Sequence, residues 1–219
     1  MAHNISIITG HYGSGKTEFS VNFALSLKQT HEKVFLVDLD IVNPYFRSND
    51  SRALLEDAGV RVIAPSYAGT NVDIPVLPPE IMRIFEEKDA QIVLDVGGDD
   101  DGAIALGRYK QYFDKNGYNL YLVVNTRRPL TATKEDILQM KTDIEVASRL
   151  SVSAFIADTN LAEETTAELV EEGYQILEEV SNLTNIPIAF VCATEHVAEK
   201  LSPKYKEKLF PIIRRTIKL

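Results

Sequence analysis

Residues 10–17 have the sequence Gly-His-Tyr-Gly-Ser-Gly-Lys-Thr, and this run constrains the fold of the chain more than any other feature. It matches the phosphate-loop pattern G-x-x-x-x-G-K-[ST]. An apolar, β-branched run over residues 5–9 precedes it and is typical of a buried strand. After Thr17, apolar residues continue as far as Leu27, which favours a buried helix. A strand, a glycine loop and a helix in this order are the context in which the pattern binds phosphate.

The residue types of the loop explain how it would hold a nucleotide. Its glycines let the backbone bend so that successive N–H groups point inward, and the following helix adds the positive end of its dipole. Lys16 supplies a point charge for the β- and γ-phosphates, and the Thr17 hydroxyl is a ligand for Mg²⁺. The residues of this segment that we predict to bind the nucleotide are Gly13, Ser14, Gly15, Lys16, Thr17 and Glu18.

The length and composition predict one globular domain spanning residues 1–219. A chain of 219 residues can bury a sizeable core, and 45% hydrophobic with 25% charged residues is ordinary for a globular protein. No apolar run approaches the roughly 20 residues needed to cross a bilayer. The first predicted strand begins at residue 5, which leaves no room for a signal peptide, so we expect a cytoplasmic protein. Cys192 is the only cysteine, which excludes a disulfide within the chain.

Strand and helix patterns alternate along the sequence. Apolar, β-branched runs predict strands at 5–9, 33–40, 60–64, 91–95, 118–125, 152–157 and 186–193. Helical spacing predicts helices at 17–27, 51–58, 81–87, 131–150 and 161–183. Prolines and weak periodicity predict loops at 41–47 and 65–79. Because the strands are apolar throughout and alternate with helices, the pattern predicts an α/β P-loop NTPase fold, with a mostly parallel sheet covered by helices on both faces.

Three aspartates lie where predicted strands end. Asp38 and Asp40 close the second strand, and Asp95 closes the fourth. In an open parallel sheet, ligands lie outside the carboxyl ends of the strands, so we expect these carboxylates near the phosphate loop. Asp95 and Gly98 fit the form D-x-x-G, in which the acid holds Mg²⁺, usually through water, and the glycine N–H meets the γ-phosphate. We therefore predict Asp95 as a metal residue, together with Thr17, and Gly98 as a nucleotide contact.

These segments resemble the deviant-Walker ATPases, the family of MinD, ParA and the nucleotide-binding domain of the cobyrinate amidases CobQ and CobB. The residues that carry the resemblance are 10–17, 37–40 and 94–98. The resemblance implies an ATP-dependent switch. It also implies that Asp38 lies near the metal, and that Asp40 orients the attacking water, which makes Lys16 and Asp40 the expected catalytic residues.

The resemblance extends, by element order, to the side of the site that would hold the base. Asn160 follows a predicted strand where the family keeps a base-contacting Asn, and residues 193–196 lie where the family's last loop passes the base. Guanine readers of this class use the Asp of an Asn/Thr-Lys-x-Asp run, whose carboxylate accepts the N1 and N2 protons of guanine. The segments that follow the predicted strands at 118–125 and 152–157, residues 125–128 and 160–163, lack this run, and the one match in the sequence, at 133–136, lies inside the predicted helix at 131–150. We therefore expect ATP and Mg²⁺ as the cofactors.

The loop departs from the family at two positions. Family members carry a lysine early in the loop that reaches the nucleotide of a partner subunit, whereas this chain has His11, followed by Tyr12 in place of a glycine. An imidazole is a poor substitute for a fixed cation against phosphate. The departure argues against a nucleotide-sandwich dimer and leaves a homodimer of another kind open, with Arg47 or the pair Arg127 and Arg128 near the phosphates.

Charge is distributed unevenly along the chain. Residues 150–199 hold ten acidic residues and no Lys or Arg, which argues against nucleic acid as a partner. Residues 204–219 hold six basic residues and one acidic residue among apolar ones, a composition that resembles the membrane-targeting tail of MinD. Pro211 interrupts this tail, so we favour a terminal helix packed on the sheet over membrane binding.

Three consecutive acids, Asp99, Asp100 and Asp101, follow the predicted γ-phosphate contact and have two interpretations. In one they bind a second metal or a basic partner, and in the other they form a solvated loop.

The leading hypothesis is a Mg²⁺-dependent ATP-binding protein, a slow ATPase that acts as a switch or assembly factor on an unknown protein partner. One alternative is an ATP-dependent small-molecule ligase or kinase, similar to cobyrinate amidase or dethiobiotin synthetase. Its second pocket would come from residues 65–80 and 99–116. Another alternative is an ATPase scaffold at a membrane surface that uses the basic tail.

Overall fold

The computed structural model describes residues 3–39, 49–64, 80–87, 89–98 and 100–214, which form an α/β fold around one sheet. The strands are β1 (Ile5–Thr9), β2 (Lys33–Leu39), β3 (Arg61–Ile63), β4 (Ala90–Val96), β5 (Asn119–Val124), β6 (Ala154–Ala157), β7 (Ile188–Ala193) and β8 (Leu209–Pro211). Their order in the sheet is β3-β2-β4-β1-β5-β6-β7-β8, and every neighbouring pair is parallel. All carboxyl ends of these strands therefore lie along one edge.

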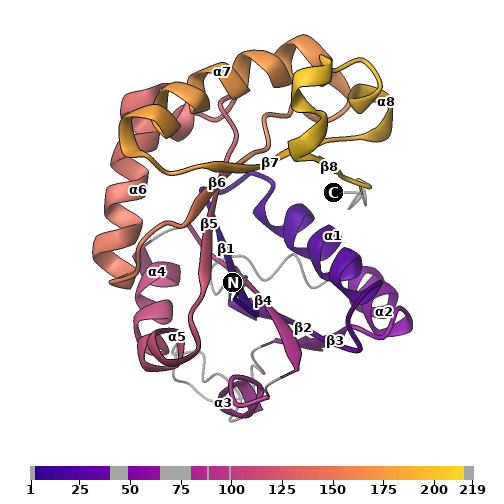
Figure 1. Cartoon of the computed structure of the whole chain (residues 1–219), viewed down its shortest axis with the longest axis vertical. Coiled ribbons are helices and arrows are strands. Elements are labelled where there is room, and N and C mark those ends of the chain that lie inside the picture. The colour runs from indigo at the N-terminus through magenta and orange to yellow at the C-terminus, as the bar shows by residue number, and fades with distance from the viewer. Residues whose placement is uncertain (1–2, 40–48, 65–79, 88, 99, 215–219) are drawn as a thin grey trace.

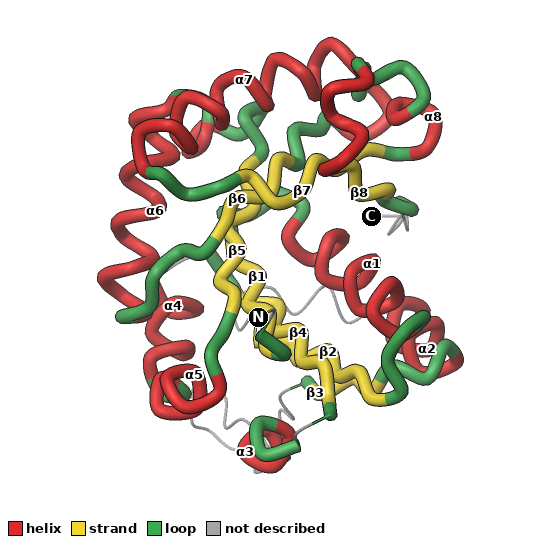
Figure 2. Tube along the Cα trace, viewed as in Figure 1, coloured by secondary structure: helices red, strands yellow, loops and turns green. Residues whose placement is uncertain are grey.

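Helices cover both faces of the sheet (Figure 1). They are α1 (Lys16–Lys28), α2 (Asn49–Asp57), α3 (Glu80–Ile84), α4 (Asp100–Gly107), α5 (Lys110–Asn116), α6 (Lys134–Ser148), α7 (Ala167–Thr184) and α8 (Glu195–Ala198). Short 3₁₀ turns occur at Pro129–Thr131, Ala162–Glu164 and Pro203–Lys208. Figure 2 shows α1 and α2 on one side of the strands and α4, α5 and α6 on the other. The predicted fold class is confirmed, and the sheet is parallel throughout the described chain.

Two apolar layers hold the helices on the sheet. The larger one packs α3 to α7 against the strands and includes Phe113 and Phe155, both fully buried. The other lies under α1, where Phe19 is fully buried against the aromatic rings of Phe190 and Phe210 at centroid distances of 5.5 and 5.0 Å. After β1 the chain crosses to β2 on one side of it, and after β4 the chain crosses to β5 on its other side. The loop after β1 therefore lies at the switch point of the sheet, where sheets of this kind bind ligands.

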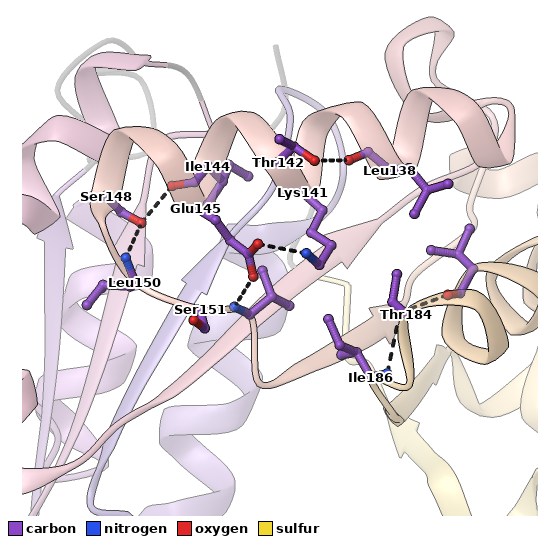
Figure 3. A network of polar contacts seen from close by, with 12 residues as sticks. Leu138, Lys141, Thr142, Ile144, Glu145, Ser148, Leu150, Ser151, Thr184 and Ile186 are labelled. Carbon is purple, nitrogen blue, oxygen red and sulfur yellow. Dashed lines mark hydrogen bonds and ion pairs between the residues drawn. The ribbon is translucent and has the colours of Figure 1, made fainter.

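The end of α6 shows how local polar contacts set helix boundaries (Figure 3). The Ser148 hydroxyl donates to the Ile144 carbonyl at 2.6 Å and accepts from the Leu150 N–H at 3.2 Å. Glu145 accepts from the Lys141 ammonium at 2.7 Å. The Ser148 hydroxyl thus pairs the Leu150 N–H, which lies just beyond the helix, while the Lys141 contact joins two side chains one turn apart.

Several predicted boundaries differ from the observed ones for identifiable reasons. The helix predicted at 131–150 begins at Lys134, because Thr133 caps it through a capping box with Asp136. The helix predicted at 161–183 begins at Ala167, because the Thr166 hydroxyl accepts from the Leu169 N–H. The helices α4 and α5 were not predicted from the sequence. Residues 100 and 101 begin α4, so they do not belong to a loop, while Asp99 lies outside the described residues.

The expected terminal helix is wrong, since the chain adds the strand β8 beside β7 after the 3₁₀ turn. Phe210 of β8 packs into the layer under α1, and Ile212 donates its N–H to the Ala193 carbonyl at 2.8 Å. The Ile213 N–H donates to the Asn22 side chain at 3.1 Å, and Asn22 donates back to the Ile213 carbonyl at 3.2 Å. The tail is therefore packed on the domain as far as residue 214. Among the described residues, no helix is long and apolar enough to span a membrane.

Candidate functional site

The phosphate loop joins the inner strand β1 to the start of α1. Gly13 and Gly15 have φ angles of +75° and +91°, in the left-handed region that side chains rarely adopt. The Ser14 N–H donates to the His11 carbonyl at 2.9 Å, which closes a turn inside the loop. The Phe19 N–H donates to the Gly15 carbonyl at 2.9 Å, so helical bonding begins at the last loop residue. The glycines thus permit the sharp turn that brings the chain to the helix N-terminus.

The side chains of the loop fit a bound anion. Lys16 is the first residue of α1 and is only 6% exposed, while Thr17 and Glu18 beside it are half-buried. The Ser14 hydroxyl is completely buried and has no hydrogen-bond partner among the residues that the structure describes. Such an unpaired group costs about 1–3 kcal/mol. A phosphate oxygen in the loop would supply the missing partner.

Two of the predicted carboxylates lie side by side at the sheet edge. Asp38 and Asp95 are register partners on β2 and β4, and they are 9% and 2% exposed. Asp38 lies two residues after Leu36, and Asp95 lies two residues after Val93. Both Leu36 and Val93 belong to the apolar layer under α1. Because side chains alternate along a strand, both carboxylates face the side of the sheet that carries α1. Asp40 lies outside the described residues.

A serine that the sequence analysis did not identify links Asp95 to the loop helix. The Ser20 hydroxyl lies 3.2 Å from Oδ1 of Asp95 and 2.8 Å from the Lys16 carbonyl, so it can donate to either oxygen. In the described part of the chain, no three His, Cys, Asp or Glu residues are arranged to hold a metal by themselves.

Gly98 lies directly against the phosphate loop. A Cβ atom on this residue would lie 2.0 Å from the Gly10 carbonyl oxygen and 2.7 Å from the His11 nitrogen. The buried Thr9 hydroxyl donates to the Gly97 carbonyl at 3.3 Å and joins the same two segments. Only a glycine allows this approach of two backbones. The predicted γ-phosphate contact therefore lies next to the loop, as its proposed role requires.

The two arginines after β5 have different partners. Nε of Arg128 donates to the Gly13 carbonyl at 2.9 Å, so this guanidinium is bonded to the phosphate loop. Arg127 instead forms an ion pair with Glu172 of α7. The structure thus brings one member of the predicted pair to the loop. Arg47 lies outside the described residues.

Asn125 connects both sides of the site. It is fully buried at the end of β5, and its amide donates to the Asn160 carbonyl at 3.0 Å and to the Gly13 carbonyl at 3.4 Å. Its side-chain oxygen accepts from the Asn160 N–H at 3.3 Å. Asn125 was not predicted as a site residue, although it closes an apolar run as Asp95 does, and that signal could have identified it from the sequence.

A cavity of about 230 Å³ opens beside the loop, on the side away from β2 and β4. Asn160, the predicted base contact, lines it. The other lining residues are Gly13, Gly15, Glu18, Asp158, Thr159, Thr165, Cys192, Ala193, Thr194, Ile212 and Arg214. The first residues of the predicted turn at 193–196 belong to it, whereas Ile212 and Arg214 of the tail were not predicted.

Asp158 is a buried carboxyl group in this cavity wall. A Cβ atom on Gly15 would lie 1.8 Å from its Oδ2, so the acid touches the phosphate loop. Burial raises the pKa of Asp158 to about 7, against a lowering contribution from the Asn160 hydrogen bond. The Glu18 carboxylate raises this pKa further and Arg214 lowers it. A buried acid that titrates near neutrality at a predicted binding loop is typical of functional sites.

A second cavity of about 210 Å³ lies on the other side of the loop, between it and α6. Its lining residues are His11, Gly98, Ala103, Leu130, Asp136, Gln139, Met140, Asp143 and Ile144. Nδ1 of His11 lies 3.1 Å from the Tyr12 carbonyl oxygen, and Tyr12 itself is 71% exposed. Of the residues predicted for a second substrate pocket, 65–80 and 99–116, this cavity uses Ala103, while residues 65–79 lie outside the described residues.

Comparison with known proteins identifies the fold but no family. No family profile matches the sequence, and no curated protein matches it. The cell division protein FtsY of Thermotoga maritima is 18% identical, with a TM-score of 0.55 over 87% of this chain and 62% of that chain. Chloroplast FtsY of Physcomitrella patens is 18% identical, with a TM-score of 0.56 over 85% of this chain and 57% of that chain.

A third similar structure is FlhF complexed with GTP and Mg²⁺. It is 17% identical, with a TM-score of 0.50 over 86% of this chain and 64% of that chain. The chain thus covers less than two thirds of the length of each of these structures. They confirm the P-loop NTPase fold, and they belong to a group of P-loop proteins distinct from MinD and ParA.

Proposed function

We propose that this chain is a Mg²⁺-dependent ATP-binding P-loop protein that hydrolyses ATP slowly and acts as a switch on a protein partner. The observation that carries the proposal is the left-handed Gly13 and Gly15 leading into α1, with Lys16 buried at its first position. Inward N–H groups and a helix dipole at such a loop favour phosphate.

Each residue has a proposed role in binding and hydrolysis. Lys16 neutralises the β- and γ-phosphates, and Thr17 with Asp38 and Asp95 holds Mg²⁺ directly or through water. When bound, the ion would supply positive charge against the phosphates during transfer. Asp40 orients the attacking water in this scheme.

The choice of ATP rests on the base side of the site. The GTP and Mg²⁺ in the FlhF structure support a triphosphate and this metal as ligands of the fold, but that protein shares only 17% identity. The one Asn/Thr-Lys-x-Asp run, at 133–136, forms the capping box of α6, so the residues of this run that would read guanine are used to cap a helix. This and the position of Asn160 in the cavity favour adenine. Slow turnover is proposed because Arg128 is already bonded to the loop. A free arginine finger contributes about 10³–10⁵ in rate.

A thermal-shift titration with Mg-ATP and Mg-GTP tests the proposal. A ligand at about 100 times its dissociation constant stabilises the fold by about 2.7 kcal/mol. We expect a larger shift with Mg-ATP, lost in Lys16→Ala. The matched control is Lys28→Ala at the other end of α1, where the ammonium bonds the Glu32 carbonyl. Retention of the shift in Lys16→Ala would refute the phosphate site, and a larger shift with Mg-GTP would refute the choice of base.

The proposal also covers the location of the protein, its domain organisation and its partners. We infer a single cytoplasmic domain that contacts a protein partner or a second copy of itself, without the nucleotide-sandwich arrangement that needs a lysine at position 11. The packed residues Leu209 to Arg214 make a membrane role for the tail the less favoured reading. Light scattering with and without Mg-ATP would measure nucleotide-dependent association.

An ATP-dependent ligase or kinase acting on a small molecule is a second candidate. The cavity of about 210 Å³ beside His11 and Gly98 favours it, because this cavity adjoins the proposed position of the γ-phosphate. Hydrolysis of ATP without any added metabolite would support the switch. Phosphate release that requires an added carboxylate or amine acceptor would support the ligase or kinase.

A further inference from the structure

The amide group of Asn160 is held in one orientation by Asp158. Nδ2 of Asn160 donates to the main-chain oxygen of Asp158 at 3.0 Å and to its Oδ1 at 3.3 Å. A main-chain carbonyl can only accept, so the nitrogen end of the amide has to face Asp158. This end also faces the loop, since Nδ2 lies 3.6 Å from the position of a Cβ on Gly15.

The oxygen end of the same amide is available to a ligand. Asn160 lines the cavity of about 230 Å³, and none of the described residues donates a hydrogen bond to its Oδ1. The backbone of Asn160 is fixed at both its N–H and its carbonyl by the fully buried Asn125. A rotation of the side chain that exposed Nδ2 instead would break the contact with the Asp158 carbonyl.

We propose that Asp158 is a positioning residue for base recognition, which holds the Asn160 amide with its oxygen toward the cavity so that the site selects a purine with an amine at its 6-position. The proposal rests on the proposed function, in which the phosphates occupy the loop. Asn160 contacts the base, and Asp158 fixes the orientation of the Asn160 amide that decides which base is bound.

The orientation of the Asn160 amide decides which purine the site binds. Adenine carries an N6 amine, a donor, where guanine carries O6, an acceptor. An amide oxygen accepts from the adenine amine and repels O6. A site built around such a bond rejects an analogue that lacks the donor, because the acceptor is then left unpaired. One neutral hydrogen bond corresponds to about tenfold in affinity.

The test compares Mg-ATP with Mg-purine riboside triphosphate, which differs from ATP only by lacking the N6 amine. We expect the wild type to bind Mg-ATP about tenfold more tightly, and Asn160→Ala to bind the two equally. Asp158→Ala removes the side-chain acceptor at 3.3 Å but keeps the main-chain acceptor at 3.0 Å, so the affinity ratio should fall part of the way toward one. Asp158→Asn keeps an acceptor of the same size and should retain the ratio, which a merely structural role of the charge would not predict.

The outcomes separate this inference from the proposed function. If the wild type binds neither triphosphate, the proposed function fails. If it binds both equally and Lys16→Ala abolishes both, nucleotide binding stands and the role of Asp158 and Asn160 is refuted. An unchanged ratio in Asp158→Ala, with a thermal transition like that of Asp158→Asn, would also overturn the role of Asp158.

Discussion

Nε of Arg128 donates a 2.9 Å hydrogen bond to the main-chain oxygen of Gly13, although 115 residues separate them in the chain. The contact ties the segment after β5 to the turn of the phosphate loop. Gly13 is left-handed at this point, and its backbone is held there from outside the loop. The loop is therefore preorganised by a cation that does not belong to its sequence motif.

Arg128→Ala should weaken binding of Mg-ATP by about tenfold, because a hydrogen bond from a charged donor contributes about 1.5–3 kcal/mol and part of that free energy orders the loop. Titration with a fluorescent ATP analogue measures the change. Arg127→Ala is the matched control: its partner is the exposed Glu172, and such surface pairs contribute about 0–1 kcal/mol. Equal effects of both variants would contradict a specific role of Arg128.

Ser20→Ala should reduce the affinity for Mg²⁺ in the presence of ATP by roughly three- to tenfold, because Asp95 loses a donor worth about 1 kcal/mol that orients its carboxylate. Calorimetric titration of Mg²⁺ measures the effect. Ser148→Ala provides the comparison, since Ser148 is also fully buried and also bonds the carbonyl four residues earlier. It should lower the free energy of unfolding without changing the affinity for Mg²⁺.

Gly98→Ala should destabilise the fold by about 1–3 kcal/mol and abolish tight nucleotide binding, because its Cβ would lie 2.0 Å from the Gly10 carbonyl oxygen. Two backbones would have to separate to relieve this contact. Urea unfolding and nucleotide titration measure the two effects. Gly107→Ala is the control, where the nearest atom is the end of the Arg149 side chain at 3.2 Å. A stable Gly98→Ala variant with normal affinity would disprove the contact.

Asp158 makes stability depend on pH. Its pKa is about 7 in the folded protein against an ordinary 3.8, mainly through burial, so the folded state binds more protons than the unfolded state between these values. The contribution is complete below pH 3.8 and is lost as the pH rises through 7. The free energy of unfolding should therefore fall by at most about 1.4 kcal/mol per pH unit across this window.

Asp158→Asn should remove this dependence, so that the variant gains stability relative to wild type as the pH rises from 4 to 7 and keeps a constant difference above it. Urea unfolding at several pH values without nucleotide measures the difference. The charged groups that act on Asp158 are Glu18 and Arg214, which remain in the variant. Asp143→Asn, an exposed change, should give a curve parallel to wild type. A parallel curve for Asp158→Asn would contradict the shifted pKa.

Much of the fold was predictable because the signals are local. The strand at residues 5–9 is observed with the predicted boundaries, and the acids Asp38 and Asp95 lie at the expected sheet edge. The helices α4 and α5 were missed, since short helices give too few turns for a clear period. The strand β8 was missed for another reason: it carries three residues and exists only because β7 offers an open edge.

The sequence by itself determined the phosphate loop, the alternation of strands and helices, and the acids at the strand ends, because each depends on neighbouring residues. The tertiary structure alone decided that Arg128 bonds Gly13, that Ser20 approaches Asp95, and that Asp158 lies against Gly15. These pairs lie far apart in the chain and meet only through the order of the parallel strands. No local pattern encodes such contacts, because strand order is set by packing across the whole sheet.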